Sequence, residues 1–299
     1  MNLSKFLEIA EGEMRIFSMP VGTCLKRYGK QYEEDAEMIL SFIEQLANDL
    51  GYEFKQMLNM YLQFVNRQIK LNKVFLKNGT YEYATEEQIK SIISSKEFQI
   101  DNIFILGLSY VLAPHRYEMF KYVKAYIQRF INPGDRCLEI GTGIGLDCSI
   151  IDKQKAFIDT YDLNTYSSFC LKKLNVSSKV SFFAKDYLLS NEEKFEHCIL
   201  IEILEHLQDP LIYLQHISKI LKDGGKAILT FAIRTPQIDH IYLFQSVTQV
   251  RDMIAKTTLK IIDQDFFISS FMDYDVSQKE FLAEASKYPA TYACVVQKY

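Results

Sequence analysis

Residues 136–146 read Arg-Cys-Leu-Glu-Ile-Gly-Thr-Gly-Ile-Gly-Leu, and this stretch constrains the fold more than any other part of the chain. The residues before the first glycine are mostly apolar and suit a buried parallel strand. Gly141, Gly143 and Gly145 then let the backbone turn sharply because no Cβ stands in the way, and an apolar pattern beyond them begins a helix. A strand, a glycine loop and a helix in this order predict the first part of a nucleotide-binding βαβ unit, in which main-chain amides at a helix N-terminus hold the ligand.

Short apolar runs and helical patterns alternate through the second half of the chain. Further strands are expected at residues 156–161, 179–184, 197–202, 226–231, 260–267 and 292–297, with helices at 208–221 and 244–255. Alternation of this kind predicts a doubly wound α/β sheet whose ligands bind at the carboxyl ends of the strands.

Helical periodicity dominates the first half of the chain. Helices are expected at residues 3–17, 32–50, 54–76, 103–113 and 117–130, and the capping box Thr85-Glu86-Glu87-Gln88 opens another short one. We therefore predict two domains, an all-helical domain over residues 1–131 and a sheet domain over residues 132–299.

Composition narrows the classes of protein to which the chain can belong. Of its 299 residues 48% are apolar and 24% are charged, which is typical of a globular protein with a sizeable core. The six cysteines form no CxxC pair and are expected to be reduced core residues. Acidic residues stand where a signal peptide would be basic, and the longest apolar run, 103–113, is too short to span a membrane. We expect a cytoplasmic protein without a membrane segment.

The net charge of −4 argues against nucleic acid as the main partner. One helix is nevertheless locally basic, with Arg67, Lys70, Lys73 and Lys77 at helical spacing. These residues form either a stripe that follows phosphates or the solvated face of an amphipathic helix, and the second interpretation is favoured.

The segment His115-Arg116-Tyr117 opens the helix that leads into the glycine loop. It could overhang the ligand site. A helix start with polar residues turned toward solvent is the interpretation that we favour.

Four motifs in order give the sheet half a resemblance to the class I S-adenosylmethionine-dependent methyltransferases. Residues 139–145, Glu-Ile-Gly-Thr-Gly-Ile-Gly, match the first motif of that family, and their third glycine comes one residue too early for the dinucleotide fingerprint. An aspartate, Asp162, follows the second expected strand, and Glu-Ile-Leu-Glu-His-Leu at 202–207 matches the motif after the fourth. Leu-Lys-Asp-Gly-Gly at 221–225 matches the turn before the fifth strand. The resemblance covers about residues 115–299, whereas the N-terminal helices match no family.

The resemblance implies a seven-stranded Rossmann-like sheet with an antiparallel last strand and a helix within residues 268–290. It also implies S-adenosylmethionine as the cofactor. Asp162 lies 19 residues beyond Gly143, where a carboxylate can bind both hydroxyls of a ribose, and Asp186 would face the adenine. The implied cofactor-binding residues are Glu139, Gly141, Thr142, Gly143, Gly145, Asp162, Leu163, Asp186, Tyr187 and Glu202.

Glu202, Glu205 and His206 are the candidate catalytic residues, because a helical turn after the strand would gather them near the transferred methyl group. In one interpretation they bind a divalent cation (Mn²⁺, Fe²⁺, Zn²⁺ or Mg²⁺) together with His240. This arrangement resembles the Glu-x-x-Glu-His and distal histidine of small-RNA 2′-O-methyltransferases, and in part the ubiquinone-pathway O-methyltransferases. In the other interpretation Glu202 and His206 shape the pocket, or His206 is a general base without a metal.

The leading hypothesis is a methyltransferase acting on a small-molecule or peptide-like acceptor, with product S-adenosylhomocysteine. The helical domain would serve as a lid, an acceptor pocket or a homodimer surface. The alternatives are an RNA-modifying methyltransferase, a different transfer from the same cofactor, a partner-binding pseudoenzyme and a nicotinamide oxidoreductase. The glycine spacing and the Glu202–His206 motif argue against the last of these.

Overall fold

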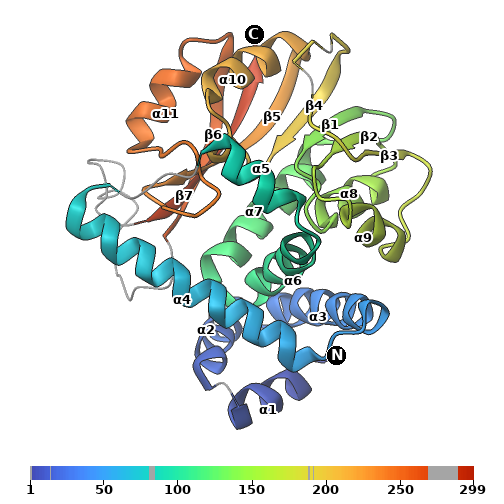
Figure 1. Ribbon diagram of the computed structural model, residues 1–299. Helices are drawn as coiled ribbons and strands as arrows, with labels where there is room; N and C mark the ends of the chain where they lie inside the picture. Colours follow the sequence, from blue (N-terminus) through green and yellow to red (C-terminus); the bar gives the residue numbers. More distant parts are fainter. Residues whose placement is uncertain (1, 14, 81–84, 188, 191, 269–288) are drawn as a thin grey trace.

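The computed structural model describes residues 2–13, 15–80, 85–187, 189–190, 192–268 and 289–299 (Figure 1). Its sheet has seven strands in the order β3-β2-β1-β4-β5-β7-β6. The strands are β1 (Arg136–Ile140), β2 (Phe157–Tyr161), β3 (Val180–Phe183), β4 (Phe195–Leu200), β5 (Leu221–Ile233), β6 (Leu259–Ile268) and β7 (Ala290–Lys298). Strands β1 to β5 pair in parallel, and β7 lies antiparallel between β5 and β6. The expected seven-stranded methyltransferase-like sheet with an antiparallel last strand is confirmed. The helix expected within 268–290 falls outside the described residues.

Both faces of the sheet are covered, which explains why its strands are apolar without a break. Helices α7 (Pro114–Phe130), α8 (Leu146–Lys153) and α9 (Ser167–Lys173) pack on one side, and α10 (Pro210–Ile220) and α11 (Val247–Ile254) on the other (Figure 1). In β4, Cys198 and Leu200 join the core under α10 and α11, while Ile199 between them joins the core under α7. All six cysteines are buried and free, as expected.

The N-terminal half is helical, and most expected helices are confirmed. It contains α1 (Leu3–Glu13), the 3₁₀ turn Arg15–Phe17, α2 (Ser18–Tyr28), α3 (Lys30–Leu50), α4 (Phe54–Asn78), α5 (Glu86–Ser94) and α6 (Lys96–Leu112). The Thr85 capping box is present at the start of α5. Helix α6 begins at Lys96 rather than at residue 103, because the Ser95 hydroxyl accepts a hydrogen bond from the amide of Phe98 and caps it.

The single helix expected over residues 3–17 is wrong. The chain breaks at the 3₁₀ turn Arg15–Phe17 and starts a new helix, α2, at Ser18. Pro20 explains the break, since proline lacks an amide proton and is tolerated in the first turn of a helix but not in its interior. The buried side chain of Phe17 anchors the turn to the core.

The helical half lies across the carboxyl edge of the sheet and shares a core with it. Tyr32, Phe104 and Tyr117 belong to one hydrophobic cluster that continues into Ile144 and Leu146 of the glycine loop. Helix α7 contributes to this cluster and also packs on the sheet. The domain boundary at residues 131 and 132 therefore stays a prediction. Among the described helices, none is long and apolar enough to cross a membrane.

Two glycine-to-alanine substitutions should change the stability of the fold in opposite directions, because one glycine packs between α6 and α3 and the other is exposed on α2. A Cβ on Gly107 would lie 2.7 Å from Cδ1 of Ile43, so Gly107→Ala should destabilise the fold by about 1–3 kcal/mol through overpacking. A Cβ on the exposed Gly22 of α2 would meet open space, so Gly22→Ala should stabilise it by about 0.5–1 kcal/mol. Urea unfolding of both variants measures the difference. Changes of the same sign would contradict the packing described here.

Candidate active site at the carboxyl edge of the sheet

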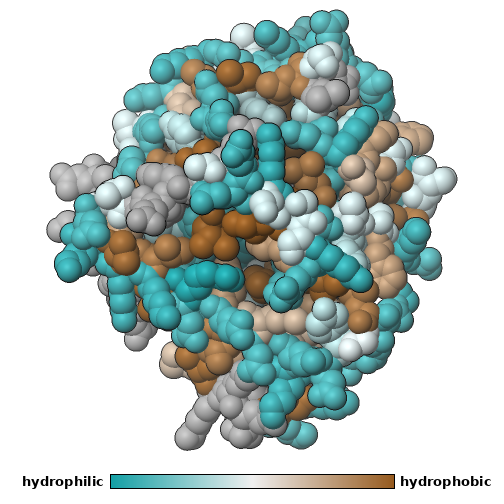
Figure 2. Space-filling model, in the orientation of Figure 1, coloured by the Kyte–Doolittle hydropathy of each residue, from teal (hydrophilic) through white to brown (hydrophobic). Residues whose placement is uncertain are grey.

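A cavity of about 880 Å³ lies between the carboxyl edge of the sheet and the helical half. Its walls come from the glycine loop, the segments after β2, β3, β4 and β5, and helices α4 to α7. In Figure 2, hydrophobic side chains gather around a hollow at the centre of the face that Figure 1 shows. Ligand pockets usually measure about 300–1,000 Å³, so this cavity is large enough for a nucleoside cofactor and part of a second molecule.

The glycine loop approaches the segment after β4 so closely that side chains are excluded. Gly141 has a φ of +90°, and a Cβ on it would collide with the side chain of Ile203. Gly145, with a φ of +76°, stands immediately before α8. The predicted glycines therefore line the cavity and also let the loop pack against the turn that follows β4.

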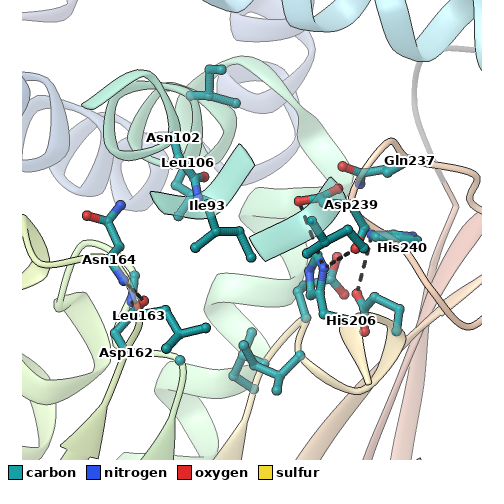
Figure 3. Close-up of a pocket in the computed structure, with 18 of the residues that line it drawn as sticks. Ile93, Asn102, Leu106, Asp162, Leu163, Asn164, His206, Gln237, Asp239 and His240 are labelled. Atoms are coloured by element: carbon teal, nitrogen blue, oxygen red, sulfur yellow. Dashed lines mark hydrogen bonds and ion pairs between the residues drawn. The ribbon is translucent and has the colours of Figure 1, made fainter. Parts of the chain in front are cut away.

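Asp162 lies at the end of β2 and points to the glycine loop. It accepts hydrogen bonds from the amides of Gly143 at 2.8 Å and Asn164 at 2.7 Å. Burial raises the pKa of Asp162 above its ordinary value, although these hydrogen bonds act in the opposite direction. Leu163 is 47% exposed, and both residues line the cavity (Figure 3). Their position agrees with the expected cofactor site.

Glu139 does not line the cavity but supports the loop from below. Its carboxylate accepts hydrogen bonds from Thr160 Oγ1 at 2.5 Å and Cys148 Sγ at 2.9 Å, and Thr160 bonds Thr142 of the loop at 2.7 Å. Burial, and then the charge of Asp147, raise the pKa of Glu139 to about 8. This residue, expected to touch the cofactor, instead positions the loop that would hold it.

Asp186 and Tyr187 follow β3 and have different environments. Asp186 is exposed and lines the cavity. Tyr187 is buried, and its hydroxyl lies 3.0 Å from Nε2 of His216 on α10. Tyr187 therefore fixes the segment that carries Asp186.

Helix α6 is tied to the loop after β2 by contacts that the sequence patterns missed. Asn164 Nδ2 donates to the carbonyl of Gln99 at 2.8 Å, and Thr165 Oγ1 donates to Gln99 Oε1 at 2.9 Å. Ile93 of α5, with Asn102 and Leu106 of α6, lines the same wall of the cavity (Figure 3). The helical half thus covers the expected ribose site. A lone glutamine carries no sequence signal for such a role.

Arg116 enters the site from α7 and pairs with Glu202. Its Nη1 lies 2.8 Å from Glu202 Oε2, with the two side chains 13% and 17% exposed. His115 and Tyr117 are buried, so the expectation that this cluster faces solvent is wrong. Pro114 at its first position starts the helix, and the flanking residues Ala113, His115 and Arg116 line the cavity.

Glu202 itself is held in a strained conformation. Its φ is +54°, in the left-handed region that few non-glycine residues adopt. Its amide donates to Thr230 Oγ1 at 2.6 Å, and that hydroxyl lies 3.2 Å from Glu202 Oε1. These contacts aim the following 3₁₀ turn, Leu204–His206, toward the loop after β5.

Glu205, His206 and His240 come together, with one potential ligand atom from each lying within 4.8 Å of the others. The Nδ1 atoms of His206 and His240 lie 2.8 Å from the carbonyl oxygens of Asp239 and Thr235, respectively. Because a carbonyl only accepts, each Nδ1 carries a proton, and in the neutral imidazole each Nε2 keeps a lone pair. The Nε2 of His240 lies 4.0 Å from Glu205 Oε1.

The electrostatics of this cluster suit a bound cation. Glu205 is fully buried, and neither carboxylate oxygen has a hydrogen-bond donor in the part of the chain that the structure describes. Burial, and then the charge of Glu202, raise the pKa of Glu205 to about 8. Burial and His206 lower the pKa of His240 to about 3. Burial lowers the pKa of His206, but Asp239 and Glu205 outweigh it and the pKa is raised.

Three of the four expected metal ligands are therefore gathered, and the fourth is not. The carboxylate of Glu202 is engaged by Arg116 and is not part of the Glu205, His206 and His240 cluster. Two imidazoles with fixed tautomers and one carboxylate match a donor set that Fe²⁺, Mn²⁺ and Zn²⁺ accept. The residues present fit a divalent cation.

The basic stripe on α4 is exposed to solvent at Arg67, Lys70, Lys73 and Lys77, as the favoured interpretation expected. Arg67 also lines the cavity, near its rim. The stripe as a whole runs along the outside of the helix.

Comparison with known proteins agrees with this geometry. Residues 115–259 match the family model of a methyltransferase domain. A ubiquinone biosynthesis O-methyltransferase of Xanthomonas campestris pv. campestris is 30% identical over 112 residues, which cover 35% of this chain and 46% of the relative. The match therefore spans less than half of that relative's length.

Two solved structures share the fold. The magnesium protoporphyrin IX methyltransferase of Synechocystis PCC 6803 with bound S-adenosylmethionine aligns over 74% of this chain and 100% of its own, with a TM-score of 0.53 and 13% identity. An N-methyltransferase of Bradyrhizobium japonicum in complex with S-adenosylhomocysteine aligns over 71% of this chain and 97% of its own, with a TM-score of 0.51 and 13% identity.

The raised pKa of Glu139 predicts a pH effect on stability. Its folded-state pKa, about 8, lies above its ordinary value, so the folded state binds the proton more tightly and stability falls as the pH rises toward 8. In Glu139→Gln this loss disappears, and the stability of the variant relative to the wild type should rise by up to about 1.4 kcal/mol per pH unit between about pH 5 and 8. Urea unfolding across this range measures it. Glu34→Gln, on an exposed helix face, is the control, and parallel profiles for Glu139→Gln and the wild type would contradict the prediction.

Proposed function

We propose that the protein transfers the methyl group of S-adenosylmethionine to a hydroxyl of a small-molecule or peptide-like acceptor, assisted by a divalent cation. Residues 115–259 match a methyltransferase domain, and the fold is shared with class I methyltransferases that bind S-adenosylmethionine or S-adenosylhomocysteine. The observation that carries this proposal is the Glu205, His206 and His240 cluster on the wall of the cavity that the glycine loop lines. The Xanthomonas relative is named as an O-methyltransferase, which supports oxygen as the accepting atom.

Binding of the cofactor is assigned to the residues at the ends of β1, β2 and β3. The amides of the glycine loop are suited to the methionine part, and Asp162 to the ribose hydroxyls. Asp186 would face the adenine. The carbonyl of Gln99 on α6 accepts a hydrogen bond from Asn164 and so fixes the segment after Asp162. The helical half and the sheet therefore both position the expected ribose site. S-adenosylmethionine supplies an already activated methyl group, and the protein mainly has to align the acceptor with it.

The acceptor side of the cavity is assigned to Glu205, His206 and His240. A divalent cation bound there would act as a Lewis acid and lower the pKa of a hydroxyl that it binds. The two imidazoles are oriented by main-chain carbonyls, and Arg116 keeps Glu202 away from the cluster. Without a cation, His206 would be the base that removes the hydroxyl proton. The two versions share the same acceptor position and differ in what Glu205 does.

Binding of S-adenosylhomocysteine tests the cofactor assignment. In Asp162→Ala the dissociation constant should rise at least about tenfold, since a charge-assisted hydrogen bond contributes about 1.5–3 kcal/mol. Calorimetric titration measures it. Asp159→Asn is the control, because Asp159 lies on the same strand and pairs with Arg136 away from the cavity. Equal affinity of the wild type for NADH, or unchanged affinity in Asp162→Ala, would contradict the assignment.

Titration of Mn²⁺, and separately of Mg²⁺, into protein saturated with S-adenosylhomocysteine tests the cation. We expect one site per chain, which is lost in Glu205→Gln while the affinity for S-adenosylhomocysteine stays within about twofold. Turnover should fall by orders of magnitude in the same variant.

Glu202→Gln tests whether the cation has three protein ligands (Glu205, His206 and His240) or whether Glu202 is a fourth. Because Arg116 already engages the Glu202 carboxylate, this variant should keep the cation site. Loss of the site in Glu202→Gln would restore Glu202 as a ligand. Cation binding that persists in Glu205→Gln would leave His206 as the base.

A further inference from the structure

Three polar side chains of helix α4 are buried at the wall of the cavity, and each has one polar atom without a partner among the described residues. Tyr61, Gln68 and Asn72 line the cavity and are only 1%, 6% and 8% exposed. Their spacings of seven and four residues put them on one face of the helix. Tyr61 Oη, Gln68 Oε1 and Asn72 Oδ1 form no hydrogen bond with any described residue. We call these three residues the α4 polar row.

Burying such a row lowers the stability of the folded protein. A buried polar atom without a hydrogen bond destabilises the fold, and proteins satisfy nearly all of them. The same helix carries Gln63 and Asn66 on its exposed side, where water satisfies them. Three unsatisfied polar atoms on one buried face therefore indicate that a ligand pairs with them.

The two ends of helix α4 lie next to different parts of the candidate site. Tyr61 lines the same cavity as Arg116 of α7. Arg116 also pairs with Glu202 at 2.8 Å. At the other end, Phe75 packs on Leu243, and the guanidinium of Arg234 lies 5.2 Å from the centre of its ring. Helix α4 therefore spans the cavity from α7 to the segment after β5.

The charges around the row select for a neutral ligand. The row itself consists of a phenol and two carboxamides, and the charge of Arg116 is balanced by Glu202. The part of the cavity wall that α4, α5 and α6 form also carries two cations, Arg67 and Lys90, and two anions, Glu97 and Asp101, so these charges balance as well. From Tyr61 to Asn72 it extends about 16 Å along the helix axis, at about 1.5 Å per residue. Apolar side chains line the cavity beside it, among them Phe64, Leu71 and Ile89.

We propose that the α4 polar row binds the methyl acceptor, and that this acceptor is an elongated neutral molecule with hydroxyl, carbonyl or amide groups along one side and apolar groups along the other. This inference rests on the proposed function, because it assigns the acceptor to the same cavity. Tyr61, Gln68 and Asn72 are specificity-determining residues that bind the acceptor away from the reacting hydroxyl.

A matched pair of double variants tests the row. Gln68→Leu/Asn72→Leu removes two polar groups from the buried face, and Gln63→Leu/Asn66→Leu makes the same chemical change on the exposed face. Without any ligand, the buried-face variant should unfold about 2–4 °C higher than the wild type, because it loses unsatisfied groups. The exposed-face variant should not gain stability. An equal or lower Tm for the buried-face variant would mean that the groups have structural partners and would overturn the proposal.

Binding is measured by calorimetry with two probes, hexyl glucoside and hexyl phosphate, in the presence of saturating S-adenosylhomocysteine. The wild type should bind the neutral glucoside at least about tenfold more tightly than the anionic phosphate. The buried-face variant should lose at least about tenfold in glucoside affinity, whereas the exposed-face variant should match the wild type. Tighter binding of the phosphate, no glucoside binding by the wild type, or an unchanged glucoside affinity in the buried-face variant would overturn the inference.

The affinity for S-adenosylhomocysteine in all three proteins distinguishes this inference from the proposed function. If the wild type binds S-adenosylhomocysteine and the row fails its test, only the acceptor assignment is lost. If the wild type does not bind S-adenosylhomocysteine, the proposed function fails, whatever the α4 variants do.

Discussion

The ion pair between Arg116 and Glu202 is the contact on which the arrangement of the site depends. It joins the start of α7 to the end of β4 with both side chains largely removed from water. Removing one member would leave a poorly solvated charge behind, which is far more costly than the pair itself is favourable. Because Glu202 also sits at a φ of +54°, the pair and the Thr230 hydroxyl together determine where the next turn places Glu205 and His206.

Much of the site consists of polar groups that weaken the fold as it stands. The oxygens of Glu205 and the α4 polar row are buried without hydrogen bonds among the described residues, and Glu202 has a strained backbone. Features of this kind persist where function requires them, and well-packed elements elsewhere carry the stability. Here the sheet and the helical core provide it, with large buried side chains such as Tyr32, Phe104 and Phe231.

Local patterns predicted the elements well and their mutual contacts poorly. The apolar strands and the glycine loop were found because burial on both faces and positive φ angles leave a direct mark in the sequence. The helix expected over residues 3–17 was wrong because Pro20, which follows the periodic segment, belongs to the first turn of a new helix that starts at Ser18. His115 and Arg116 were expected in solvent, since a polar helix start does not reveal that a cavity lies in front of it.

The sequence by itself determined the alternating strands and helices and the glycine loop at the carboxyl edge, because these follow from short-range periodicity and spacing. The family resemblance of its motifs added the seven-stranded arrangement and the carboxylates after β2 and β3. Only the tertiary structure decided that His240 joins Glu205 and His206, that Glu202 turns to Arg116 instead, and that α4 faces the cavity with three unsatisfied polar groups. These contacts join residues far apart in the chain. The first is set by the segments after β4 and β5, the other two by the packing of the helical half on the sheet, and no local pattern records that geometry.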